Sequence, residues 1–197
     1  MNQSYAHHQT EGEKIIGGLM ELVNFALTEQ FPRVRVDLND VEQVIDALHA
    51  LGPESSELWF LDGLLQVARG DWQGAAQTFR DLVDTSTSLP FSRGMLMYAL
   101  QKCGDPQWRF EAQALCEGNH ADVSLLAQTL IAGEDMRRAV AAARRTGRFD
   151  KPDSVLAMEE ARERLAGLRA GAAPARADAA PKTPPAMPLW AGHALRA

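Results

Sequence analysis

The sequence has little cysteine, no long apolar run and no excess of positive charge, and each shortage excludes a class of protein. Cys103 and Cys116 are its only cysteines in 197 residues, too few for a disulfide scaffold, so we expect two half-buried thiols in a reducing compartment. No run approaches the roughly 18 apolar residues of a membrane-spanning helix, and the polar start MNQSYAHHQTEGEK lacks the apolar section of a secretory signal. The net charge of −6 argues against non-specific binding to duplex nucleic acid.

Residue patterns that carry chemistry are also missing. The sequence contains no phosphate-binding loop and no nucleophile paired with a base. Glu54 and Glu57 stand three apart at an expected helix start, where stabilising the helix dipole explains them better than acid–base catalysis. His120 and Asp122 flank another helix boundary without a third metal ligand, so helix capping or a polar surface explains them better than a metal site. We therefore predict no catalytic residue, no metal and no cofactor, which disfavours an enzyme acting on peptidoglycan.

Apolar residues recur at helical spacing from about Thr10 to Ala170. Two sets define amphipathic segments: Ile15, Met20, Leu22, Phe25 and Ala26, and then Val41, Val44, Ile45 and Leu48. Prolines stand where such helices would start or stop, namely Pro32, Pro53, Pro90, Pro106 and Pro152. The pattern predicts an all-α protein with about eight or nine helices of roughly 10 to 18 residues and no sheet.

A period of 34 residues separates two Gly-Asp steps, which begin at Gly70 and Gly104. Glycine suits the left-handed end of a helix, and aspartate suits the cap of the next. Between Ser56 and Leu89 the small residues Gly63 and Ala75 stand between the large residues Trp59 and Phe79, as in a tetratricopeptide repeat. We expect the small pair at the contact between two antiparallel helices and the large pair filling the volume around it.

Two positions depart from that repeat. Asp62 stands where a leucine is usual, and Gln66 replaces the usual aromatic residue, so the inner surface is expected to carry a polar notch. Degenerate copies of the repeat precede and follow this one, and three stacked hairpins would be enough to bury a continuous core. The predicted architecture is a tetratricopeptide-like stack of antiparallel helical hairpins.

Composition divides the chain into three parts. Residues 1–11 are expected to form a flexible leader, residues 12–170 the helical domain, and residues 171–197, rich in alanine and proline, a disordered tail. Charge is uneven as well, with a net −9 in residues 1–90 and a net +3 in residues 91–197. Such a division can steer self-association or a charged partner, although a solvated surface would also explain it.

A basic face is predicted in the second half of the chain. Arg137 and Arg144 stand seven residues apart, as do Arg138 and Arg145, so on a helix they form two rows on one broad face, with Arg148 close behind. This face could meet an anionic polymer, lipid headgroups or the acidic half of a second copy, or could simply be a solvated surface.

The stretch SELWFLDGLLQVARGDWQGAAQTFRDLVDTS, followed by LPFSRGMLMYALQKCGDPQWRFEAQAL, resembles the HrpK-like family of bacterial type III secretion proteins over roughly residues 12–150. This resemblance implies a non-enzymatic accessory role in a Hrp-type secretion apparatus, and an architecture similar to the small tetratricopeptide chaperones that hold needle subunits before export. Expected partners are a pilus, needle or inner-rod subunit or a ring component, with a second copy as a further option.

Two forms of that role follow. In the first, the protein is a cytoplasmic chaperone or scaffold whose concave groove accepts an amphipathic helix of a filament subunit. The residues expected to line this groove are Trp59, Asp62, Gln66, Met95 and Tyr98. In the second, the protein is a periplasmic scaffold associated with the cell wall, exported by means of its polar leader, and the basic face contacts an anionic surface.

Overall fold

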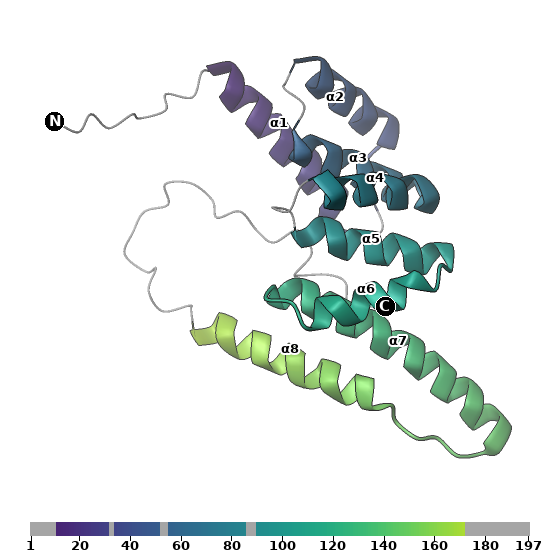
Figure 1. Cartoon of the computed structure of the whole chain (residues 1–197). Coiled ribbons are helices and arrows are strands. Elements are labelled where there is room, and N and C mark those ends of the chain that lie inside the picture. Colours follow the sequence, from purple (N-terminus) through teal and green to yellow (C-terminus); the bar gives the residue numbers. More distant parts are fainter. Residues whose placement is uncertain (1–10, 32–33, 52–54, 86–89, 172–197) are drawn as a thin grey trace. The chain divides into compact units, whose positions relative to one another are not determined.

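The computed structural model describes residues 11–31, 34–51, 55–85 and 90–171, and the regular secondary structure in those ranges is helical (Figure 1). Eight helices form in this part of the chain and no strand does, which confirms the all-α prediction. The helices are α1 (Glu11–Thr28), α2 (Leu38–Leu51), α3 (Ser56–Arg69), α4 (Trp72–Thr85), α5 (Pro90–Cys103), α6 (Gln107–Cys116), α7 (Ala121–Thr146) and α8 (Asp153–Gly171). Successive helices pack as antiparallel pairs, as predicted. Contacts divide the chain into two units, of which the first ends at Leu82 and the second begins at Val83.

Small-against-large packing of α3 on α4 organises the first unit. Phe79 is fully buried, and a Cβ added at Gly63 would come within 2.5 Å of its ring, so the glycine is what lets the two helices approach. Ala75 is fully buried as well. On α2, the predicted apolar positions Val41, Ile45 and Leu48 are all buried. The expected placement of Gly63, Ala75 and Phe79 is therefore confirmed.

Trp59 does not fill the volume around that contact, and the prediction that it does was wrong. Its side chain is 45% exposed, whereas the next residue, Phe60, is 7% exposed and meets Phe79 edge to face at 5.6 Å. Consecutive helical residues point about 100° apart, so only one of two adjacent aromatic residues can face α4. Phe60 takes the inward position and leaves Trp59 at the surface.

Glycines end the first helix of three successive hairpins. Gly70, Gly104 and Gly147 have φ of 77°, 74° and 74°, a left-handed conformation that a side chain disfavours. Aspartate follows both of the first two glycines: Asp71 caps α4 by accepting a hydrogen bond from the Gly74 amide, and Asp105, just before Pro106 at the N-cap of α6, accepts one from the Gln107 amide. Both predicted Gly-Asp turns are confirmed.

The second unit consists of the end of α4 followed by α5, α6, α7 and α8. Helix α5 is buried over most of its length, and α6 contributes Trp108 and Ala112 to the interior. Asp135 on α7 ties this unit together, because it accepts hydrogen bonds from Arg109 on α6 (2.7 Å) and Ser154 on α8 (2.8 Å). Prolines adjoin helix starts as predicted at Pro90, Pro106 and Pro152.

Three details differ from the sequence-based expectations. Helices α7 and α8 contain 26 and 19 residues, more than the expected upper length, because alanine, arginine and glutamate sustain an exposed helix without packing. In α1 the buried residues are Val23 and Leu27, which were not among those singled out. Cys103 is exposed, although Cys116 is partly buried as expected, and both thiols are free.

Several sequence-based predictions fall on positions outside the described residues. These are the leader up to residue 10, the tail from residue 172, Pro32, Pro53 and Glu54. The division into a leader, one domain and a tail therefore stays a prediction. Near Glu54, the described Ser55 supplies the cap of α3, where its hydroxyl accepts a hydrogen bond from the Leu58 amide at 3.2 Å.

Candidate functional site

An exposed tryptophan is held in place on the surface of the first unit. Trp59 projects from α3, and the ring of His49 on α2 packs against it with ring centroids 5.0 Å apart and planes tilted by 59°. An aromatic side chain that is both exposed and fixed loses little conformational entropy when it contacts a partner. Trp59 is therefore suited to contact a partner, and its place in a binding groove stays a prediction.

The polar notch beside Trp59 is a set of satisfied hydrogen bonds. His49 and Asp62 lie 2.7 Å apart, from Nε2 to Oδ2. Burial raises the pKa of the Asp62 carboxyl, and the hydrogen bond and charge of His49 oppose that rise. One turn further along α3, Gln66 Oε1 accepts a hydrogen bond from the Thr78 hydroxyl of α4 at 2.9 Å. The two departures from the repeat pattern are thus matched by polar partners on both neighbouring helices.

Sequence reasoning did not find those partners. His49 directly follows the buried Leu48, so the periodicity of α2 places it at the edge of the apolar side of the helix, where it can reach α3. A histidine at the edge of the apolar side of α2, together with an aspartate at a position of α3 where leucine is usual, is the sequence feature from which the contact between His49 and Asp62 could have been predicted.

Two further residues of the predicted groove belong to the second unit. Met95 is 7% exposed and Tyr98 is half-buried, both on α5. Burial raises the pKa of the Tyr98 hydroxyl, and the Lys102 ammonium lies over its ring at 5.2 Å from the centroid. The first unit brings together Trp59, Asp62 and Gln66, while Met95 and Tyr98 are adjacent on one turn of α5. That all five line one groove stays a prediction.

An ion pair joins the first half of α2 to the end of α3. The Arg69 guanidinium donates to both carboxylate oxygens of Glu42, at 2.6 and 2.7 Å. This two-point geometry lowers the pKa of Glu42 through hydrogen bonding. Both groups are partly exposed, so the pair fixes helix register more than it adds stability.

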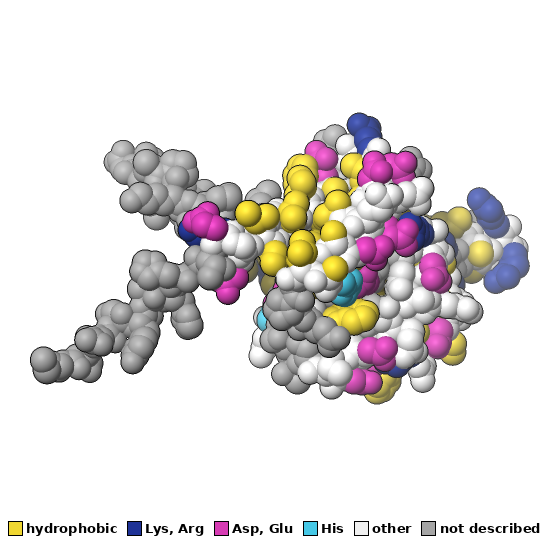
Figure 2. Space-filling view, turned by 90° about the horizontal axis from the view of Figure 1, so that it is seen from above, with side chains coloured by type: hydrophobic (Ala, Val, Ile, Leu, Met, Phe, Trp, Pro, Cys, Tyr) yellow, Lys and Arg dark blue, Asp and Glu magenta, His cyan; other side chains and the backbone are white. Residues whose placement is uncertain are grey.

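Helix α1 presents an apolar stripe to the solvent. Ile15, Leu22 and Phe25 are each more than half exposed, and they recur at spacings of seven and three that place them on one side of the helix. Figure 2, which views the molecule from the side of α1 and α2, shows hydrophobic side chains gathered in one patch. The spacing therefore identified an apolar side of α1, formed by Ile15, Leu22 and Phe25. That side is exposed, and the buried residues Val23 and Leu27 lie on the other side of the helix.

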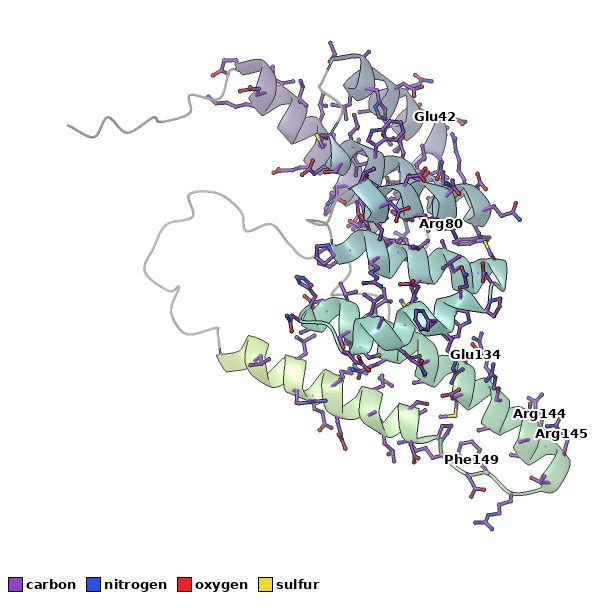
Figure 3. The ribbon with its side chains drawn as sticks, in the orientation of Figure 1. Glu42, Arg80, Glu134, Arg144, Arg145 and Phe149 are labelled. Atoms are coloured by element: carbon purple, nitrogen blue, oxygen red, sulfur yellow. The ribbon has the colours of Figure 1, made fainter. Side chains whose placement is uncertain are left out.

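The predicted basic face lies on α7, and its four residues, Arg137, Arg138, Arg144 and Arg145, are all exposed. Arg138 pairs with Glu134 one turn earlier. Figure 3 shows Arg144 and Arg145 pointing outward from the last turn of α7, with Phe149 in the loop that follows. No ion pair within the described ranges involves the other three arginines.

Two searches of the described residues found nothing. No three His, Cys, Asp or Glu side chains among them are grouped to hold a metal ion. None of the helices in these ranges is both long enough and apolar enough to cross a membrane.

Comparison with known proteins identifies the family. No curated protein and no solved structure matches the chain. A family model, described as bacterial type III secretion protein (HrpB1_HrpK), matches residues 7–136, about two thirds of the chain. The match covers α1 to α6 and the first half of α7, including Trp59 and its polar neighbours. The resemblance seen in the sequence is confirmed, and the chain belongs to the HrpB1_HrpK family of bacterial type III secretion proteins.

Proposed function

We propose that this chain is a non-enzymatic accessory protein of a Hrp-type secretion system. In this proposal it acts in the cytoplasm as a chaperone or scaffold and binds a component of the apparatus. The expected ligand is an amphipathic helix of a pilus, needle or inner-rod subunit. A free subunit exposes the apolar side that it buries in the assembled filament, and a chaperone that covers this side prevents early polymerisation.

The observation that supports this proposal best is the exposed, fixed Trp59. Binding energy at protein interfaces concentrates in a few aromatic and arginine residues surrounded by polar contacts. Trp59 is 45% exposed, is packed by His49, and has Asp62 one turn away on the same helix. We assign Trp59 as the anchor, Asp62 and Gln66 as polar contacts that orient the ligand helix, and Met95 and Tyr98 as further contacts from α5.

Affinity purification tests this function directly. The tagged full-length chain would be recovered from cells grown under secretion-inducing conditions, and every co-purifying protein would be identified. We expect a small filament or inner-rod subunit. Binding of that purified subunit should weaken at least about 30-fold in Trp59→Ala, because an interface anchor contributes about 2 kcal/mol or more.

A matched control uses another exposed aromatic residue. Phe110 on α6 is 73% exposed, and Phe110→Ala should leave the affinity for the subunit unchanged. Equal losses in the two variants would remove Trp59 from the interface. Recovery of ring or secretin components with no filament or rod subunit would instead support a periplasmic scaffold.

A further inference from the structure

The end of α7 is the most basic part of the chain. Residues 137–151 contain five arginines, one lysine and a single carboxylate, Asp150, which gives this segment a net charge of +5. Because the whole chain carries −6, the remaining residues together carry −11. A charge separation of this size orients the molecule in an electric field, with the basic segment toward a negative surface.

Folding of α7 does not account for this charge. Its buried residues, Val123, Ser124, Ala127 and Ala132, all lie in its first half, and no residue of the helix after Ala132 is buried. Cations in the last turn stabilise the helix dipole, which explains Arg144 and Arg145, but Arg137 and Arg138 lie two turns earlier. The second half of α7 is therefore an exposed helix whose arginines are not needed for packing.

The geometry of the basic face suits an extended anion better than a small one. Arg137 and Arg144 are seven residues apart, about 10 Å along the helix, and Arg138 and Arg145 form a second row beside them. A single phosphate could contact only neighbouring guanidinium groups, whereas a layer of phosphates could contact all four. Arginine suits phosphate because its planar guanidinium donates two hydrogen bonds at once.

A folded protein partner would be recognised differently. Protein interfaces have an apolar centre with aromatic anchors, but the centre of the basic face, between its two rows, holds Ala141 and Glu134, and the exposed Val140 lies only at its edge. Phe149 follows α7 in the loop, and Figure 3 shows it away from Arg144 and Arg145. A fluid surface of anionic headgroups needs no matching shape, since the lipids rearrange around the cations.

We propose that the basic face, Arg137, Arg138, Arg144 and Arg145, docks this protein on the phosphate headgroups of an anionic lipid bilayer. The contact is peripheral, because the face consists of arginines and the exposed Val140 at its edge is too short to anchor the helix in the bilayer interior. Each arginine near such a surface contributes a separate increment of attraction, and salt weakens all of them. This docking is independent of the proposed binding at Trp59, which lies in the other unit.

Vesicle co-sedimentation tests the proposal with the full chain. We expect binding to vesicles of phosphatidylcholine with about 30% phosphatidylglycerol, no binding to pure phosphatidylcholine, and weakening as salt is raised. The double variant Arg144→Glu/Arg145→Glu should lose at least about 30-fold in partition constant. Arg144→Gln/Arg145→Gln, which adds no negative charge, should lose a smaller part in the same direction, and circular dichroism would verify that both variants fold.

Arg162→Glu/Arg164→Glu on α8 is the matched control. It changes the net charge by the same amount at two exposed arginines, and it should retain most of the binding. Equal loss in this control, or no binding to anionic vesicles, would overturn the proposal. Displacement by millimolar inorganic phosphate would indicate a single-anion site instead. Binding of polyglutamate as tight as that of the vesicles would indicate an acidic polypeptide, and either result would also overturn it.

Discussion

A single missing side chain sets how closely α3 and α4 pack. At Gly63 an added Cβ would come within 2.5 and 2.6 Å of two ring atoms of Phe79, which is fully buried. Replacing this glycine must therefore shift either the ring or the helix. The close approach of the two helices depends on this position more than on any propensity of α3 to form.

We expect Gly63→Ala to lower the free energy of unfolding by about 1–3 kcal/mol, because overpacking a filled interior forces strain. Urea denaturation followed by circular dichroism would measure it. Gly17→Ala on α1 is the control, since nothing lies within 4 Å of its added Cβ and alanine favours the helix by up to about 1 kcal/mol. If Gly63→Ala were as stable as Gly17→Ala, the packing argument would fail.

Asp62 gives the first unit a pH dependence of known sign. Burial raises the pKa of its carboxyl above the ordinary 3.8, so the folded chain binds more protons than the unfolded chain in the interval above that value. The contribution of Asp62 to stability is therefore greatest in acid and falls as the pH rises through the raised native pKa. An asparagine side chain at this position cannot titrate, so the variant Asp62→Asn has no such dependence.

We expect the free energy of unfolding of the wild type, relative to Asp62→Asn, to fall as the pH rises from about 3.5 to about 6.5. In a His49→Gln background the fall should be larger, because the group that opposes the rise in the pKa of Asp62 is gone. Urea denaturation at several pH values would measure both differences. A relative stability that rose over this range would contradict the assignment.

At the scale of elements, α8 packs along α7 but buries little of its own side-chain surface. Among the side chains described in α8, Val155 is the buried one, and Ser154 donates a hydrogen bond to Asp135 on α7, which also accepts one from Arg109 on α6. Burial alone would raise the pKa of the Asp135 carboxyl, but the two hydrogen bonds and the charge of Arg109 outweigh it and hold the pKa below its usual value. The ionised carboxylate is what joins the three helices.

We expect Asp135→Ala to destabilise the second unit by about 1–3 kcal/mol, because it leaves the partly buried Arg109 without its carboxylate. Amide hydrogen exchange should quicken in α8 while α5 stays protected. Asp150→Ala is the control, since its ion pair with Arg148 is largely exposed and should contribute less than about 1 kcal/mol. Similar exchange in both variants would show that α8 is held by other contacts.

For the whole molecule, the sequence predicted the fold class and the helix ends better than it predicted which side of each helix is buried. Helical spacing, prolines such as Pro90, and the glycines Gly70 and Gly104 are local signals, and the elements they predict were confirmed. Which of Trp59 and Phe60 faces inward depends on where α4 lies, and periodicity alone does not carry that information. The stripe of α1 shows the same limit, because its packing partners determine which of two apolar sides is buried.

The candidate site was predictable in part for the same reason. Asp62 and Gln66 were identified because they break a repeat pattern, and that signal lies within one helix. Their partners His49 and Thr78 lie on other helices, so the hydrogen bonds depend on the register between helices. The family, by contrast, could be identified from the sequence, because the match extends over most of the helices rather than one site.

The sequential pairing of helices has a consequence for how this chain acquires its structure. Helix α2 contacts α1 and α3, α6 contacts α5 and α7, and α7 contacts α8, so most contacts join neighbours in sequence. When contacting residues are close in sequence, bringing them together costs little chain entropy. Helical proteins dominated by such local contacts typically fold in microseconds to milliseconds. Each hairpin can form as soon as its second helix leaves the ribosome, so the first hairpins can form while later helices are still being synthesised.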